Sequence, residues 1–77
     1  MRNKTHYLNL LAQNPSAQVG FTLAASAVYA ARHGNCDDAE RGTNEWADIA
    51  RDLRKRYGES LDADQVRAEM EQPTTGV

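Results

Sequence analysis

A histidine and a cysteine with the spacing of metal ligands lie near the middle of the sequence, at His33 and Cys36. Acidic side chains follow at once: Asp37, Asp38 and Glu40. Nitrogen, sulfur and carboxylate groups of this kind can hold a metal ion, and a thiol beside an imidazole can act as a nucleophile with its base. Metal binding and thiol catalysis are therefore the first two chemistries to consider.

A structural zinc site is not predicted, because it needs four ligands that paired Cys or His motifs usually supply. His6 is the only other histidine, and Cys36 is the only cysteine. We expect Cys36 to be a half-buried turn residue beside a histidine at a helix C-terminus. As a nucleophile its thiol would be somewhat acidified near a helix start, but no oxyanion hole or orienting third residue accompanies it. We predict no metal, no cofactor and no catalytic residue, and hence no enzyme. A thiol enzyme centred on Cys36 stays as an alternative.

A basic cluster closes the segment EWADIARDLRKRYG, residues 45–58. Its members are Arg51, Arg54, Lys55 and Arg56. Positive side chains in the last turn of a helix interact favourably with the helix dipole, so the cluster has a purely structural explanation as a solvated face. The same positive charge also suits an acidic protein partner. We therefore assign the predicted partner-binding site to these four residues.

The pattern W-x-x-I-A-x-x-L from Trp46 to Leu53, followed by a break and QVRAEM, resembles Myb-type and helix-turn-helix DNA-binding domains. The resemblance covers less than half of the chain and implies a recognition helix over 63–72 that enters the major groove. The charged residues of that helix are mostly acidic: Asp64, Arg67, Glu69 and Glu71. Phosphates repel acidic side chains, so this helix is poorly suited to enter the groove. The alternative function is therefore a small DNA-binding regulator that uses the basic end of the preceding helix.

Four helices are predicted to position these residues, and no strand pattern is found. Apolar spacing, N-cap residues, glycines and prolines define the expected ranges, roughly 5–13, 16–33, 36–57 and 62–72. The predicted fold is therefore an all-α, compact bundle of about four helices. It forms a single domain over residues 1–72, followed by a disordered tail at 73–77.

The third and fourth helices carry distinct start signals. Asn35 is the predicted N-cap of the third helix, which we expect to run without interruption although Thr43 offers a second cap. At the start of the fourth helix, Asp62 and Gln65 have the spacing of a capping box.

The second helix is apolar on nearly every side between Val19 and Ala31, which predicts a central, buried position. A chain of 77 residues buries a smaller fraction of its surface than a longer chain does. Since the neighbouring helices offer few large apolar side chains, we expect a homodimer in which the second helix packs near the two-fold axis. The residues assigned to this contact are Ala24, Ala27 and Ala31.

Charge is distributed unevenly along the chain. The net charge is −2, but every acidic residue lies after position 36. A single cysteine excludes an intramolecular disulfide, and the longest apolar run is shorter than the ~20 residues of a membrane helix. We therefore expect a soluble, cytoplasmic protein that does not bind membranes.

Together these features predict a small non-enzymatic protein-binding module. Small size, helical patterning, missing catalytic motifs and uneven charge are typical of effectors by which bacteriophages and mobile elements inhibit host complexes, such as anti-CRISPR proteins or transcription-factor inhibitors. No motif of the sequence specifies this origin or this target. The expected partner is another protein, and nucleic acid is disfavoured.

Overall fold

The computed structural model describes residues 2–13, 17–58 and 61–71. Its elements are α1 (Lys4–Gln13), α2 (Ala17–His33), the short 3₁₀ helix η1 (Glu40–Gly42), α3 (Asn44–Tyr57) and α4 (Ala63–Glu71). The predicted all-α class and the order of four helices are confirmed within these residues. None of the described helices combines the length and apolar character needed to cross a membrane. The predicted tail at 73–77 lies outside the described residues.

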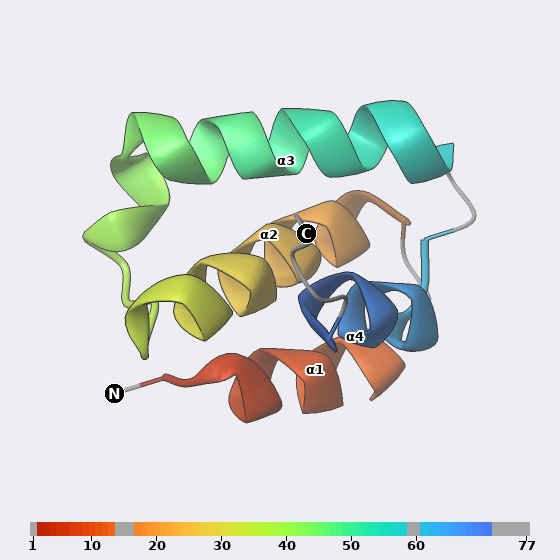
Figure 1. The fold of residues 1–77 in the computed structure, drawn as a ribbon, viewed down its shortest axis with the longest axis horizontal. Helices are drawn as coiled ribbons and strands as arrows, with labels where there is room; N and C mark the ends of the chain where they lie inside the picture. Colours follow the sequence, from red (N-terminus) through yellow and green to blue (C-terminus); the bar gives the residue numbers. More distant parts are fainter. Residues whose placement is uncertain (1, 14–16, 59–60, 72–77) are drawn as a thin grey trace, which may run out of the picture.

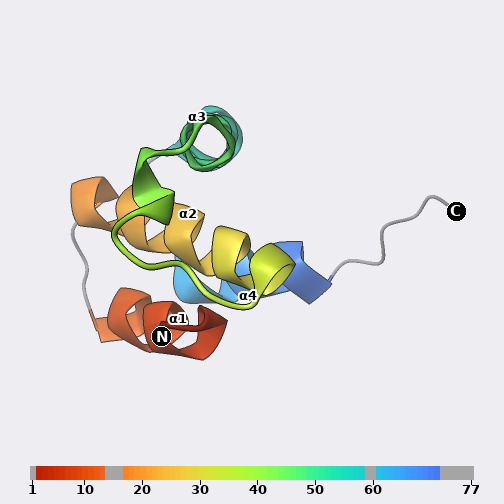
Figure 2. The same cartoon turned by 90° about the vertical axis from the view of Figure 1, so that its left-hand side faces the viewer.

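The helix α2 is the central element of the bundle (Figure 1). α3 packs along one side of α2, whereas α1 and α4 pack against it from the other side and also contact each other. In the view along α3, the body of α2 separates α3 from α1 (Figure 2). The predicted central position of the second helix is therefore confirmed.

Small side chains allow the neighbouring helices to approach α2 closely. The four consecutive residues from Ala24 to Ala27 have exposed fractions of 0 %. Besides Phe21, Val28 and Tyr29 of α2 itself, larger core side chains of the other helices surround them: Tyr7, Leu8, Leu11, Ile49, Leu53 and Val66. Backbones can pack at short distance where side chains are small, and the long side chains of the neighbours then fill the remaining space.

The single chain therefore covers most of α2 by itself. Ala24 and Ala27, to which we assigned the dimer contact, have no exposed surface left for a second copy of the chain. Ala31 is exposed, one turn further along the helix. The predicted dimer surface is thus not available at two of its three residues, because α1, α3 and α4 already occupy it. The homodimer itself stays a prediction.

The capping box predicted at the start of α4 is confirmed. The Gln65 backbone N–H donates to Asp62 Oδ1 at 2.9 Å, and the Asp62 N–H donates to Gln65 Oε1 at 3.0 Å. Val66 follows directly and is completely buried. The cap therefore sets the direction in which the first turn of α4 enters the core.

The prediction of an unbroken third helix over 36–57 is wrong. α3 begins only at Asn44, with Thr43 in an extended conformation (φ −81°, ψ 159°) as its N-cap. The Trp46 N–H donates to the Thr43 Oγ1 at 3.2 Å. Gly42, a weak helix former, directly precedes this second start signal, so the helix restarts there at little cost.

Replacing Asp62 by Ala should lower the free energy of unfolding by about 1 kcal/mol, because the first turn of α4 loses the acceptor for the Gln65 N–H. Asp62→Asn is the matched control, since the amide oxygen keeps an acceptor in the same place. Urea unfolding followed by circular dichroism measures both variants. Equal destabilisation by alanine and asparagine would show that the negative charge matters and the cap does not.

Candidate functional site

Two open grooves run along the flanks of α3. The basic groove, of about 250 Å³, lies between α2 and α3 and is lined by Phe21, Thr22, Trp46, Ala47, Ala50, Arg51 and Arg54. The acidic groove, of about 380 Å³, lies on the other flank and is lined by Arg32, Glu45, Asp48, Ile49 and Asp52. α2 is the principal neighbour of α3, so both flanks are open to solvent or to a partner.

The helical repeat explains why α3 has flanks of opposite charge. Successive residues turn by about 100°, so side chains three or four positions apart share a face. Ile49 and Leu53 are buried and define the inward face. One flank beside this face carries the acids at 45, 48 and 52, and the other carries the arginines at 51 and 54.

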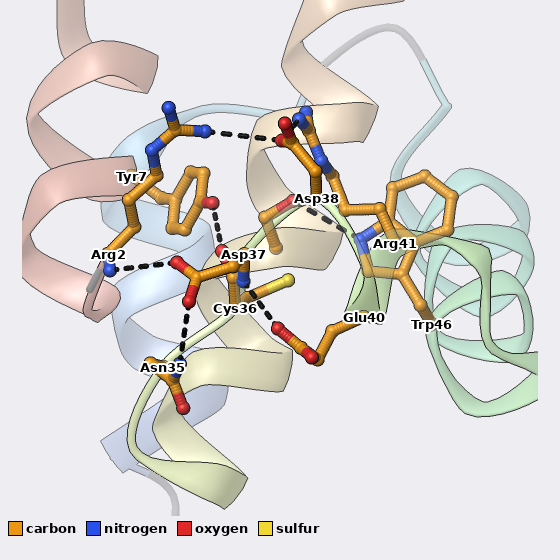
Figure 3. Close-up of polar contacts among 10 residues, drawn as sticks. Arg2, Tyr7, Asn35, Cys36, Asp37, Asp38, Glu40, Arg41 and Trp46 are labelled. Carbon is orange, nitrogen blue, oxygen red and sulfur yellow. Dashed lines mark hydrogen bonds and ion pairs between the residues drawn. The ribbon is translucent and has the colours of Figure 1, made fainter.

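Aromatic side chains form the floor of the basic groove. Phe21 of α2 is 6 % exposed, and Trp46 of α3 is partly buried against the core. The Trp46 Nε1–H donates to the Ser26 Oγ at 3.2 Å (Figure 3). Because Ser26 is completely buried, this hydrogen bond fixes the inner edge of the indole against α2 and leaves other indole atoms to line the groove.

The chain path that leads into α3 is held by residues near the N-terminus (Figure 3). The Arg2 N–H donates to Asp37 Oδ1 at 3.2 Å, and the Cys36 N–H donates to the Arg2 carbonyl at 2.9 Å. The Tyr7 hydroxyl donates to the Cys36 carbonyl. Asn35 is not a helix cap, because the next helical segment, η1, starts only at Glu40; the Asn35 side-chain amide instead donates to Asp37 Oδ2 at 3.0 Å. These contacts tie the connection between α2 and α3 to α1.

The structure does not bring His33 and Cys36 together. The His33 Nε2 lies 2.9 Å from Glu45 Oε1, whereas Cys36 is completely buried. The prediction of a half-buried cysteine is therefore wrong. Burial also raises the pKa of the Cys36 thiol, which is the opposite of the acidification that a nucleophile would need. Desolvation disfavours the thiolate more than nearby groups favour it. No group of three His, Cys, Asp or Glu side chains in the described part of the chain is placed to hold a metal.

The structure places only two of the four predicted partner-binding residues in the basic groove. Arg51 and Arg54 line the basic groove. Lys55 is exposed but does not belong to the groove lining. The Arg56 guanidinium lies 2.5 Å from Oε1 of Glu69 on α4 and 2.6 Å from Oδ2 of Asp52 on its own helix. Arg56 therefore connects two helices, which is a structural role that sequence spacing did not reveal.

Arg56, Tyr57 and Glu69 form a polar clasp between α3 and α4. The Tyr57 hydroxyl donates to Glu69 Oε2 at 2.7 Å, and Arg56 pairs with the other carboxylate oxygen. The hydrogen bond from Arg56 lowers the pKa of Glu69, and the same contact raises the pKa of Arg56. The clasp therefore holds the C-terminal end of α3 against α4 with a charged glutamate at its centre.

Sequence reasoning did not identify the α2 side of the basic groove. Phe21 belongs to the apolar stretch 19–31 and is buried, as that stretch predicts, but no sequence pattern indicated that the Arg54 guanidinium lies over its ring, at 5.2 Å from the centroid. Such a contact contributes about 0.5–1 kcal/mol at an exposed site and holds Arg54 along the groove wall. The α3 side of the groove could have been found from the sequence, because its residues share one helical face: Ala47, Ala50 and Arg54 are spaced three and four positions apart.

A double-mutant cycle should detect the hydrogen bond that orients the indole. Trp46→Phe and Ser26→Ala each remove one partner, and the combined variant removes both. We expect a coupling energy of about 0.5–1.5 kcal/mol from chemical denaturation, because a buried hydroxyl is left without its donor in the first variant. Strictly additive effects would mean that the hydrogen bond contributes nothing to stability.

Glu69→Gln should reduce stability at neutral pH by about 1 kcal/mol, with a smaller loss in acid. The folded pKa of Glu69 is lowered from 4.5, so the charged clasp contributes fully above that value. Its contribution disappears as the pH falls through the lower folded pKa. Thermal melts at neutral and acid pH measure the difference. The control is Asp64→Asn on the same helix, where the carboxylate is highly exposed; equal pH profiles for both variants would contradict the clasp.

Comparison with known proteins gives no counterpart for this geometry. No protein-family model, no curated protein and no solved structure matches the chain. A function is therefore inferred from the residues of the basic groove and from how α2 and α3 position them.

Proposed function

We propose that the chain is a small, non-enzymatic protein-binding module and that the basic groove is its partner site. The observation that carries this proposal is the meeting of two aromatic side chains and two arginines in one open groove, namely Phe21, Trp46, Arg51 and Arg54. Aromatic residues and arginine are the types most enriched at the energetic centres of protein interfaces. Each of these four is positioned by a helix and not by a loop.

The groove lining supports binding more than catalysis. Its polar side chains are Thr22, Trp46 and the two arginines, and no carboxylate, imidazole or thiol belongs to the lining; the carboxylate that pairs with Arg51, that of Asp48, is exposed. The one thiol of the chain belongs to Cys36, which is enclosed in the core with a raised pKa. General acid–base or nucleophilic catalysis requires such groups within reach of a substrate. A thiol enzyme centred on Cys36 therefore has little support.

DNA binding, the alternative, also has less support. In the form that the helix-turn-helix resemblance implies, the recognition helix is α4, which buries Val66 and engages Glu69 in the clasp with α3. Its exposed Arg67 pairs with Asp64 at 2.9 Å. A DNA-reading helix must present positive or hydrogen-bonding side chains to the duplex, and α4 does not offer a surplus of positive charge. In the form that uses the basic end of α3, Arg56 is held in the same clasp, and the acids at 45, 48 and 52 lie on the same helix as the remaining basic residues.

Inhibition of a host complex by a mobile-element effector is one biological form that such binding would take. Small size and a lack of catalytic groups support that hypothesis, which concerns the origin and target of the protein. The binding proposal does not depend on it, because the basic groove would serve an effector and an ordinary cellular adaptor alike.

A charge-reversal experiment tests the proposal. Arg51→Glu with Arg54→Glu should abolish or reduce roughly tenfold the capture of a protein partner by the tagged chain, because two groove contacts become repulsive. Capture is measured by quantitative mass spectrometry of lysates from the organism that encodes the chain and from its host. Melting temperatures should change little, since exposed charges rarely contribute more than about 1 kcal/mol to folding.

The matched control is Lys4→Glu with Arg67→Glu. Both residues are exposed and lie on α1 and α4, away from the basic groove, and the pair changes the net charge by the same amount. This control should capture the same proteins as the original chain. Equal loss of capture in both variants would show that overall charge matters and that the groove is not the partner site.

A further inference from the structure

We infer that the occupant of the basic groove is an acidic amphipathic helix of the partner protein. In this arrangement an apolar side chain of the helix lies on Phe21 and Trp46, and its carboxylates pair with Arg51 and Arg54. This inference rests on the proposed function and adds the chemistry and shape of the bound segment. The acidic groove on the other flank of α3 takes no part in it.

The size of the basic groove favours a side chain over a free small molecule. Its volume of about 250 Å³ lies below the roughly 300–1,000 Å³ of sites that enclose drug-sized ligands. It is also open, so a ligand would keep much of its surface in water. A side chain presented by a folded segment needs only a shallow recess, because the rest of the segment adds contacts along the rim.

Both arginines are available for carboxylates of a partner. Within the described residues, Arg54 has no carboxylate partner, and its guanidinium lies over the Phe21 ring. Arg51 pairs with Asp48 at 3.1 Å, but the two side chains are 75 % and 71 % exposed. Such a surface pair within one helix contributes only about 0.3–0.5 kcal/mol, so exchange for a partner carboxylate costs little. Arginine can also bind a carboxylate with two parallel hydrogen bonds.

The spacing of the two arginines matches that of acidic residues on a helix. Arg51 and Arg54 lie three positions apart, which is about 4.5 Å along the axis of α3. A partner helix that carries glutamates three or four positions apart presents carboxylates at a similar interval. The groove runs between two packed helices, and an amphipathic helix commonly fills such a groove with its apolar face.

The open flank of α3 gives such a helix a place in the bundle. α1 and α4 pack on the opposite side of α2, so neither of them covers the basic groove (Figures 1 and 2). A third helix laid beside α2 and α3 would add a neighbour where the bundle has none. Ala47 and Ala50 on the groove wall are small, so the backbone of an incoming helix can approach α3 closely.

The charge distribution on α3 favours an acidic helix over nucleic acid as the occupant of the basic groove. The acids at 45, 48 and 52 lie on the same helix as the two arginines, and the net charge of the chain is −2. A phosphate backbone carries charge along its whole length and would approach the acidic flank as well. A short acidic helix can contact the two arginines without approaching the acidic flank.

Trp46 provides a direct readout, because it is the only tryptophan of the chain and lines the groove. The probe is a synthetic helix with glutamates three and four positions apart around a stripe of leucines and without tryptophan. We expect a saturable change in Trp46 fluorescence. In the ¹⁵N-labelled protein, amide and indole shifts should concentrate on α3 from 46 to 54 and on α2 around 21.

Three further probes define the specificity. The same helix with serine in place of leucine, or with lysine in place of glutamate, should bind at least about tenfold more weakly, since each lacks one of the two contacts. A duplex DNA of similar length should not bind at physiological salt. Arg51→Glu with Arg54→Glu should abolish binding of the acidic helix, and Lys4→Glu with Arg67→Glu should keep it. Melting curves establish that both variants are folded.

Several outcomes would overturn the inference. These are no binding of the acidic helix, shifts confined to the acidic groove, equal binding of the serine version, or preference for DNA. If the acidic helix fails while protein capture still depends on Arg51 and Arg54, the inference about the occupant is wrong and the proposed function stands. If capture is also independent of these arginines, both proposals are wrong.

Discussion

The burial of α2 is the constraint on which the rest of the structure depends. A helix with apolar or small side chains on nearly every face must be covered on every face, because exposed apolar surface is costly in water. The alanines and Ser26 of its middle turns are completely enclosed, which requires close approach by α1, α3 and α4. The bundle therefore has one central helix, and the three other helices together cover it.

This arrangement gives α3 its unusual position. Two helices cover α2 from one side, and α3 covers the opposite side alone, so α3 has a buried face and two open flanks. In a larger bundle, neighbouring helices would occupy these flanks. Here they carry opposite charges and form grooves, and the charged surface most suited to recognition lies on the helix that covers one side of α2 alone.

Precise placement of the groove residues comes from two polar networks at opposite ends of α3. At the start, the N-terminal residues hold the connection around Cys36, and Trp46 is bonded to Ser26 inside the core. Toward the other end, Arg56 and Tyr57 hold Glu69 of α4. Buried or half-buried polar contacts are directional, so they fix the rotation of a helix that apolar packing alone would leave adjustable. The two arginines of the groove lie between these networks.

Local signals in the sequence were sufficient for the helices themselves. Periodic apolar residues identified the four helices and the central position of the second, and the Asp62–Gln65 capping box identified the start of the fourth. The basic character of the end of the third helix was equally clear. These features follow from contacts between residues a few positions apart, which a sequence displays directly.

Only the tertiary structure decided which of these residues act together. It enclosed Cys36, directed His33 to Glu45, and separated Arg56 from Arg51 and Arg54. It also placed Phe21 under Arg54 and covered Ala24 and Ala27 within one chain. Each of these outcomes depends on how helices rotate and approach one another. The sequence by itself determined the local elements, because capping and apolar periodicity are short-range. The basic groove required packing between segments that are distant in the sequence, and the energy of that packing cannot be read from either segment alone.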